Sequence, residues 1–161
     1  MKRIPILLVL TSSLALSVFA AMNTGSAVNG VFHASVDRAA ALRFEFGLAQ
    51  HVLLNRAGSS QITFLNPFTG QEVALEVSKG EPYPADAKNY LQRLEPIASK
   101  LEVPKGAKAG VYSVKFIAEM FLCEAVLKVC YLEETPGSFE IRVGQTGRDT
   151  PVKLEYARPQ R

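Results

Sequence analysis

The sequence predicts an all-β domain, a mainly antiparallel β-sandwich. Short runs rich in β-branched and aromatic residues recur from about residue 27 to residue 143, and turn residues separate them at short intervals. Long amphipathic helical patterns are absent from the same stretch. Strands at this spacing are typical of a sandwich or a barrel. We therefore expect one β-rich core formed by the chain after its N-terminal segment.

The first twenty residues have the pattern of a secretory signal peptide. Lys2 and Arg3 make the start basic, residues 4–20 are largely apolar, and Val18 and Ala20 place small side chains at the −3 and −1 positions of a cleavage site. We expect cleavage after Ala20, which leaves residues 21–161 as a single domain. An uncleaved anchor is the alternative, but the apolar stretch is shorter than the usual span of about 20 apolar residues.

The charge balance of the exported part argues against nucleic-acid binding. The chain has 18 basic residues, and removing Lys2 and Arg3 leaves sixteen against 15 acidic residues, a net charge of +1. Basic patches with interleaved aromatic residues are also absent from the sequence. No second apolar run is long enough to cross a membrane. These features predict an exported protein, periplasmic or secreted, without a membrane span after cleavage.

Several strands and one insertion are expected in the first part of the domain. The strand-like runs cover residues 41–48, 61–65 and 73–78, with turns at 55–60, 66–70 and 79–80. Residues 81–98 differ, because Pro82 and Pro84 precede a run up to Leu94 that predicts one or two helical turns. An insertion of this length is typical of a functional loop. An ordered crossover between two sheets is an equally good interpretation.

The strands resume after the insertion. They are expected at residues 100–103, 111–123, 129–132 and 138–143, with Pro136-Gly137 as a turn. On the longest run, alternation directs even-numbered side chains from Tyr112 to Leu122 into the core and places Cys123 on the more polar face. The polar tail from Gly144 onward is expected to fray.

The two cysteines, Cys123 and Cys130, are predicted to form a disulfide across a hairpin. An even cysteine count in an exported protein favours a disulfide. Closing so short a loop stabilises a fold by only about 2.5 kcal/mol in the chain-entropy model. A short-loop disulfide on an outward face is also open to an incoming thiolate. The pair is therefore either redox-active or a hairpin staple, and the residues alone favour the staple, because most disulfides of secreted proteins are structural.

A wider pattern around the cysteines resembles a known family. Residues 101–104, the strand that begins at Ala109, and Cys123 and Cys130 followed by Tyr131 and acidic residues resemble the N-terminal periplasmic domain of the thiol:disulfide interchange protein DsbD family. The resemblance covers about residues 82–143. It implies an immunoglobulin-like fold with an exposed cysteine pair in a hairpin. It also implies electron transfer from a thioredoxin-like domain to oxidised envelope proteins.

The resemblance assigns roles to individual residues. Cys130 would form the mixed disulfides and Cys123 would resolve them, so that both are catalytic, and Tyr131 would contact the partner. Tyr90 matches an aromatic residue that shields the pair, and residues 82–94 would then form a movable cap. The alternative is that Tyr90 packs in the core of a short helix.

The sequence departs from the family in three respects. Six residues separate the cysteines, one more than in the family, and Leu132-Glu133 stand where prolines often follow. Either difference would change the partner fit or the redox potential. The sequence also contains no thioredoxin-like or membrane segment. We therefore expect a separate component that works with a thioredoxin-like protein or a membrane electron-transfer protein.

Other chemistry is weakly indicated by the sequence. His33 and His51 have no metal-ligand spacing, so neither a metal site nor another cofactor is expected. The glutamates Glu124, Glu133 and Glu134 are interpreted as solvated charges, and the phenylalanines as core or sheet-face residues. The hypothesis that competes with thiol exchange is a non-catalytic immunoglobulin-like binding or assembly domain with a structural disulfide.

Overall fold

The computed structural model describes residues 25–159, and the signal peptide expected at residues 1–20 lies outside them. Within the described residues the chain forms twelve strands and no helix, which confirms the all-β prediction. No segment of these residues is therefore a helix that could span a bilayer.

The strands form two sheets. The first sheet has the order β1-β12-β3-β9, with β1 (Gly25–Val28), β12 (Val152–Tyr156), β3 (Ala39–Leu48) and β9 (Ile97–Glu102). The second sheet has the order β2-β11-β10-β4-β8-β7, and β5 joins it beside β10 with β6 on its other edge. Its members are β2 (Gly30–Ala34), β4 (Val52–Asn55), β5 (Gln61–Leu65), β6 (Glu72–Glu76), β7 (Gly80–Pro82), β8 (Tyr90–Leu94), β10 (Gly110–Glu124) and β11 (Val129–Val143).

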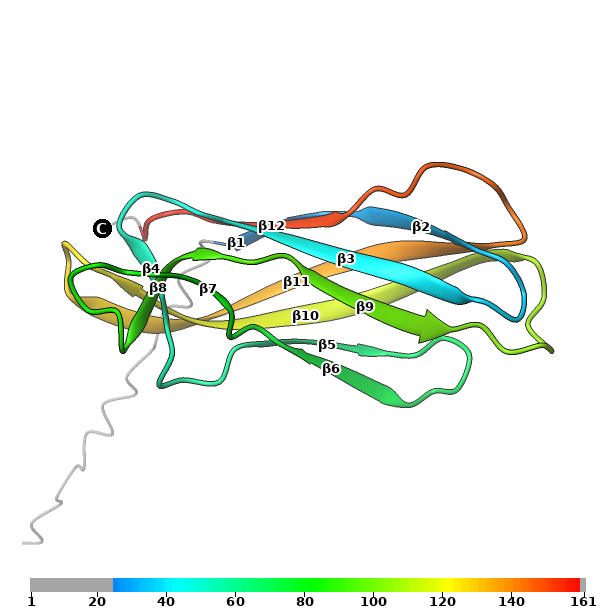
Figure 1. Ribbon diagram of the computed structural model, residues 1–161, viewed down its shortest axis with the longest axis horizontal. Helices are drawn as coiled ribbons and strands as arrows, with labels where there is room; N and C mark the ends of the chain where they lie inside the picture. Colours follow the sequence, from blue (N-terminus) through cyan, green and yellow to red (C-terminus); the bar gives the residue numbers. More distant parts are fainter. Residues whose placement is uncertain (1–24, 160–161) are drawn as a thin grey trace, which may run out of the picture.

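The two sheets stack into a sandwich elongated along the strands (Figure 1). Most neighbouring strands are antiparallel, and the pairs β2–β11 and β3–β12 are parallel. The tip of the β10–β11 hairpin lies at one end of the sandwich, at the left of Figure 1, and the loop between β7 and β8 lies at the same end. This arrangement places the cysteine-bearing tip away from the centre of the fold.

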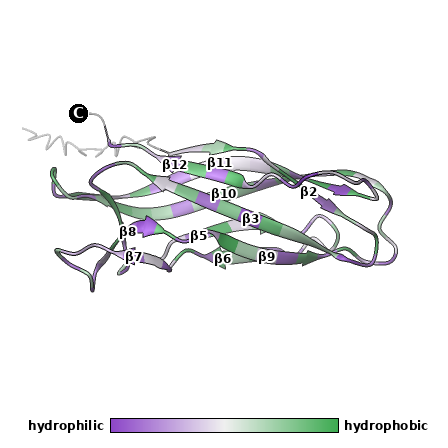
Figure 2. Ribbon diagram, turned by 45° about the horizontal axis from the view of Figure 1, so that its top comes forward, coloured by the Kyte–Doolittle hydropathy of each residue, from purple (hydrophilic) through white to green (hydrophobic). Residues whose placement is uncertain are grey.

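The core lies between the sheets and is rich in phenylalanine. Side chains alternate between buried and exposed along the strands, which Figure 2 shows as bands of contrasting hydropathy. The ring of Phe139 in β11 meets those of Phe32, Phe44 and Phe64 edge-on, with centroids 5.7, 5.9 and 5.3 Å apart. The prediction that these side chains serve the core rather than a ligand cage is confirmed for Phe64 and Phe139, both of which are buried.

The β10–β11 hairpin is more regular than the sequence predicted. The expected turn at Pro136-Gly137 is wrong, because both residues lie inside the continuous strand β11. Gly137 faces Phe116 in register, and a Cβ atom at 137 would lie 2.3 Å from the ring of Phe116. Pro136 lacks an N–H group, and it is tolerated in the strand because β11 has a paired strand, β10, on one side only at this position; β2 pairs with β11 only from Phe139 to Val143.

Two further expectations are corrected by the structure. Residues 83–89 form hydrogen-bonded turns rather than helical turns, and Tyr90 begins a strand that pairs with β4. The tail does not fray throughout, because Val152–Tyr156 form β12 between β1 and β3 with alternate side chains buried. The alternate apolar side chains of β12 are buried against the core. This burial stabilises the strand, although the neighbouring residues of the tail are polar.

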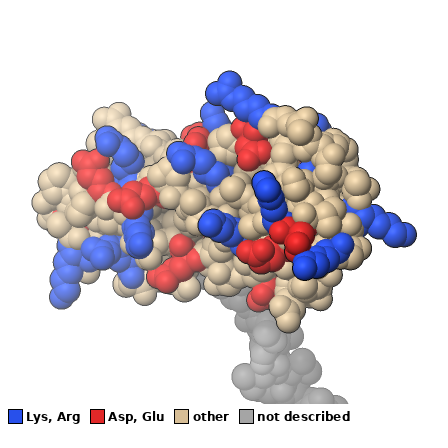
Figure 3. All heavy atoms as spheres, turned by 45° about the vertical axis from the view of Figure 1, so that its right-hand side comes forward, with Lys and Arg blue, Asp and Glu red and all other residues tan. Residues whose placement is uncertain are grey.

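The surface has no dominant charge on the face drawn in Figure 3. Lysine and arginine side chains are interspersed there with aspartate and glutamate. Exposed ion pairs between nearby residues, such as Arg43 with Glu45 and Arg93 with Glu81, follow the same mixed pattern. This mixture agrees with a net charge close to zero for the part of the chain after residue 20.

Candidate functional site

The β10–β11 hairpin brings the two cysteines directly opposite each other. Cys123 and Cys130 are register partners close to the tip, with Cα atoms 4.0 Å apart and a disulfide between their sulfurs. The predicted disulfide across a hairpin is therefore confirmed. The loop that it closes is the four-residue turn 125–128 with its flanking positions.

The two sulfur-bearing residues differ in exposure. Cys123 is only 4% exposed, whereas Cys130 is exposed. Cys123 lies in the interior of the sheet, with Cys130 on one side and Leu53 of β4 as its register partner on the other. At Cys130, β10 is the only described strand that pairs with β11. Cys123 thus has the predicted place on the face of β10 opposite the core side chains Met120 and Leu122, but it is buried there, and Cys130 is the accessible half of the disulfide.

Two tyrosines lie beside the cysteine pair. Tyr83 and Tyr90 line, together with Leu53 and both cysteines, an open hollow of about 300 Å³ at the tip. The structure thus places Tyr90, which the resemblance assigned to a shielding position, in the wall of this hollow, and it adds Tyr83, which the sequence analysis missed. Tyr83 N–H donates to the carbonyl of Tyr90 (2.9 Å), so a contact between the two backbones closes the loop between them.

Tyr90 is anchored more firmly than a movable cap would be. Its backbone is paired with Asn55 of β4, and its N–H donates to the carbonyl of Asp86 (3.1 Å). The side chain is half-buried in the wall of the hollow, and Cys130 remains exposed, so Tyr90 does not shield the disulfide fully from solvent. Any cap motion would therefore involve residues 84–89 rather than Tyr90 itself.

Tyr131 faces away from the exposed sulfur. Along β11, Cys130 and Leu132 are exposed, while Tyr131 is half-buried and packs against the hydrophobic core. Because successive side chains of a strand point to opposite faces, Tyr131 does not share the face of Cys130. Tyr131 therefore does not lie beside the accessible sulfur, whereas Leu132, which is 55% exposed, lies on the face of Cys130.

An ion pair with a buried carboxylate stabilises the tip of the hairpin. Glu124, next to Cys123, is fully buried; its carboxylate accepts a hydrogen bond from Leu127 N–H and lies 2.9 Å from the guanidinium of Arg158. Ala125 N–H also donates to the carbonyl of His51 (2.9 Å). The turn that carries the disulfide is thus attached to the rest of the fold at two points.

The electrostatics of Glu124 follow from these contacts. Desolvation by burial raises the pKa of the Glu124 carboxyl, but the hydrogen bond from Leu127 and the charge of Arg158 outweigh it, so the pKa lies below its usual range. The expectation of solvated glutamates is wrong for Glu124 and also for Glu133, which is 2% exposed and accepts a hydrogen bond from Gly25 N–H (3.0 Å). Only Glu134 of the three is exposed.

One polar side chain that touches the sulfurs was missed by the sequence analysis. The amide nitrogen of Asn55 lies 3.4 Å from Sγ of Cys123 and 4.0 Å from Sγ of Cys130. The sequence placed Asn55 correctly at the start of a turn, but nothing in its local pattern connects it with a cysteine 68 positions away.

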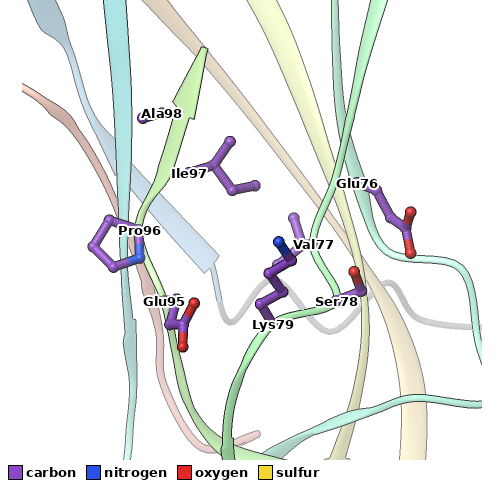
Figure 4. Close-up of a pocket in the computed structure, with 8 residues that line it drawn as sticks. All are labelled: Glu76, Val77, Ser78, Lys79, Glu95, Pro96, Ile97 and Ala98. Carbon is purple, nitrogen blue, oxygen red and sulfur yellow. The ribbon is translucent and has the colours of Figure 1, made fainter.

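The other hollows have no comparable chemistry. One of about 330 Å³ lies between residues 76–79 and 95–98 (Figure 4). The carboxylates of Glu76 and Glu95 lie on opposite walls of this hollow, and Ile97 points into its centre. Within residues 25–159, no three side chains of the His, Cys, Asp or Glu types gather as a metal site would require. His33 instead contacts Asp149, with Nδ1 3.0 Å from the carboxylate.

The comparisons with known proteins add no family assignment. No protein-family model matches the chain, and no curated protein matches it. What the molecule shows by itself is an all-β sandwich with a disulfide at the tip of its longest hairpin.

Proposed function

We propose that this domain is an exported thiol–disulfide exchange module of the periplasm or another oxidising compartment outside the cytoplasm. The observation that favours this function is the one-sided exposure of the disulfide: Cys130 is open to solvent and Cys123 is buried at 4% exposure. Thiol exchange requires a thiolate to approach one sulfur while the other leaves. An asymmetric pair at a protruding tip meets that requirement better than a symmetric buried staple.

The exchange begins with a dithiol partner of the thioredoxin-like class. Its thiolate attacks Sγ of Cys130, a new sulfur–sulfur bond forms, and the bond to Cys123 breaks, so that Cys123 leaves as a thiolate and takes up a proton. The second thiolate of the partner then attacks the mixed disulfide and releases Cys130. Two electrons and two protons reach this domain, and the partner becomes a disulfide.

The reduced domain would pass the electrons on by the reverse chemistry. The Cys130 thiolate attacks the disulfide of an oxidised envelope protein, and Cys123 then resolves the mixed disulfide. Lys128, which lines the hollow beside Cys130, adds a positive charge that favours a thiolate there. The exposed apolar side chains of Val126, Val129 and Leu132 surround the tip and supply contact area for a docked partner.

The competing function is a non-catalytic binding or assembly domain with a structural disulfide. The burial of Cys123 and the Glu124–Arg158 ion pair favour it, because both stabilise the tip in a single conformation. The reduction potential separates the two functions. A working pair should have a potential well above about −300 mV, whereas a structural bond should lie below that value.

That potential is the direct test of the proposal. We expect the purified protein, equilibrated against glutathione or dithiothreitol buffers, to reduce at a potential between those of the known exchange proteins, roughly −120 to −270 mV. The fraction reduced is read by alkylation of free thiols and mass spectrometry. A potential below about −300 mV would contradict the exchange function and favour the structural disulfide.

A second expected result concerns Tyr90. Tyr90→Ala removes a ring from the wall of the disulfide hollow, so reduction by glutathione should become a few-fold faster with little change in thermal stability. The effect is modest because Cys130 is already exposed. Tyr112→Ala is the matched control, since Tyr112 lies near the opposite end of β10 and its hydroxyl donates to Lys108. Equal rates for wild type and Tyr90→Ala would remove the shielding role of Tyr90.

A further inference from the structure

Asn55 presents an oriented hydrogen-bond donor to the disulfide. Its Nδ2 lies 3.4 Å from Sγ of Cys123 and 4.0 Å from Sγ of Cys130. Its Oδ1 accepts a hydrogen bond from Ala57 N–H at 2.9 Å. Because an N–H group needs an acceptor, this bond assigns the oxygen to the Ala57 side and the NH₂ group to the sulfur side. The orientation of the amide is therefore determined by the turn that follows β4.

The position of Asn55 is held by strands on both sides. Leu54, the preceding residue, pairs with Leu122 of β10, and Asn55 pairs with Tyr90 of β8. The donor is thus fixed relative to Cys123 before any reaction begins. A preorganised donor stabilises a developing charge without the cost of reorienting solvent or side chains.

We propose that Asn55 is a catalytic residue of the exchange reaction, in which its amide N–H stabilises the thiolate that forms on Cys123. This inference rests on the proposed function. When a partner thiolate attacks Sγ of Cys130, the electron pair of the broken sulfur–sulfur bond moves to Sγ of Cys123. A disulfide sulfur is a weak acceptor, whereas hydrogen bonds to ionised acceptors are about twice as strong. The hydrogen bond from Asn55 therefore strengthens as negative charge develops on Sγ of Cys123. It stabilises the transition state more than the disulfide from which the reaction starts, and so it lowers the activation barrier.

The burial of Cys123 makes this donor important. At 4% exposure, the Cys123 thiolate has little access to water, so the protein must supply the solvation of its charge. The ionisable side chains that line the hollow beside the two cysteines are Lys128, Glu124, Tyr83 and Tyr90. Of these, Glu124 already uses its carboxylate for Leu127 N–H and Arg158. The Asn55 amide is the described side-chain donor bonded to Sγ of Cys123.

The chain offers a matched control for Asn55. Asn66 also accepts backbone hydrogen bonds with its Oδ1, from Phe68 N–H at 2.9 Å and Thr69 N–H at 3.3 Å, in a turn that follows a strand. Asn66 comes directly after β5, which pairs with β10 from Glu119 to Phe116. Asn66 follows the Phe116 end of this pairing, so it lies away from the hairpin tip that carries the cysteines. Replacement of either asparagine by aspartate keeps the turn-capping oxygen and adds one negative charge. Only Asn55→Asp would place that charge beside the sulfurs.

The test measures the thiol pKa of Cys123 without any partner. In a Cys130→Ser background, Cys123 is the only thiol of the chain, and its ionisation is followed by thiolate absorbance near 240 nm. Asn55→Leu should raise the pKa of Cys123 by about one unit, a tenfold loss of thiolate, because a charge-assisted hydrogen bond is removed. Asn55→Asp should raise it further, because it also places a negative charge beside the sulfur. Asn66→Asp and Asn66→Leu should leave it unchanged. In the two-cysteine protein, the Asn55 variants should be reduced by glutathione a few-fold more slowly, since a leaving thiol of higher pKa leaves more slowly.

The outcomes separate the role of Asn55 from the proposed function. Asn55→Asp keeps the turn-capping oxygen, so the test does not depend on the folding of Asn55→Leu. An unchanged Cys123 pKa in Asn55→Asp, or an equal rise in Asn66→Asp, would overturn the role of Asn55 even if exchange with thioredoxin-like dithiols is efficient. A raised Cys123 pKa in the uncharged variant Asn55→Leu, together with slower reduction by glutathione, would support it. If the pKa rises but wild type exchanges with no dithiol partner, Asn55 stabilises the thiolate and the exchange function itself is wrong.

Discussion

Cys123→Ser is expected to trap a mixed disulfide between Cys130 and a thioredoxin-like dithiol protein, and Cys130→Ser is expected to trap none. The reason is the unequal exposure of the two residues: Cys130 is open to a second protein, while Cys123 is 4% exposed between β11 and β4. Without Cys123, no thiol of this chain can attack the mixed disulfide from within. The effect should be close to all-or-none, because it removes the resolving reaction.

The trapping experiment needs a partner that cannot resolve the complex itself. Each variant is incubated with a thioredoxin whose second active-site cysteine is replaced by serine and whose first is activated as a mixed disulfide with a good leaving group. The covalent complex is read on a non-reducing gel and located by mass spectrometry. Trapping by Cys130→Ser as efficiently as by Cys123→Ser would contradict the assignment of Cys130 as the attacking residue. No complex with either variant would contradict the exchange function.

Arg158→Ala is expected to destabilise the protein by about 2 kcal/mol at neutral pH, a value between those of exposed and buried ion pairs. Glu124 is fully buried, and removal of Arg158 leaves its carboxylate without its charge partner. The side chain of Arg158 is 46% exposed, which reduces the effect below that of a fully buried pair. The measurement is urea unfolding followed by far-ultraviolet circular dichroism.

Two variants control this prediction. Arg43→Ala removes an arginine from the exposed pair with Glu45 and should change stability by less than about 0.5 kcal/mol. In a Glu124→Gln background, Arg158→Ala should lower the free energy of unfolding much less than it does in wild type, because Arg158 then has no carboxylate charge to compensate. Equal decreases in the free energy of unfolding for Arg158→Ala and Arg43→Ala would show that the Glu124–Arg158 pair does not stabilise the fold.

The same pair should make the stability of the protein depend on pH. The pKa of Glu124 in the folded protein lies below its value in the unfolded chain, so the unfolded chain binds more protons at mildly acidic pH. The stabilisation by Glu124 is therefore fully present above the unfolded pKa and is lost as the pH falls through the folded pKa. The difference in stability between wild type and Arg158→Ala should be widest above about pH 5 and should narrow in more acidic solution.

Local patterns in the sequence predicted much of the fold. The alternation of apolar side chains along residues 111–123 indicated the buried and exposed faces of β10, because neighbouring side chains of any strand point to opposite faces. The strand at Gln61–Leu65 and the disulfide between Cys123 and Cys130 were predicted for the same reason: the interactions involved are short in sequence. One local pattern gave a wrong prediction. Pro136-Gly137 has the composition of a turn, yet it lies in a strand beside the ring of Phe116.

A β-rich chain with a short-loop disulfide follows from the sequence alone, since turn residues, side-chain alternation and cysteine spacing act over a few positions. Which sulfur is accessible depends on the packing of the whole domain, because β4, from a distant part of the chain, pairs with β10 at Cys123, and no such strand pairs with β11 at Cys130 among the described residues. The same packing sets the contact of Asn55 with the disulfide and the pairing of Glu124 with Arg158. These contacts join segments that meet only when the two sheets pack and the strands take their register. Burial against the common core therefore selects them, and no local pattern predicts them.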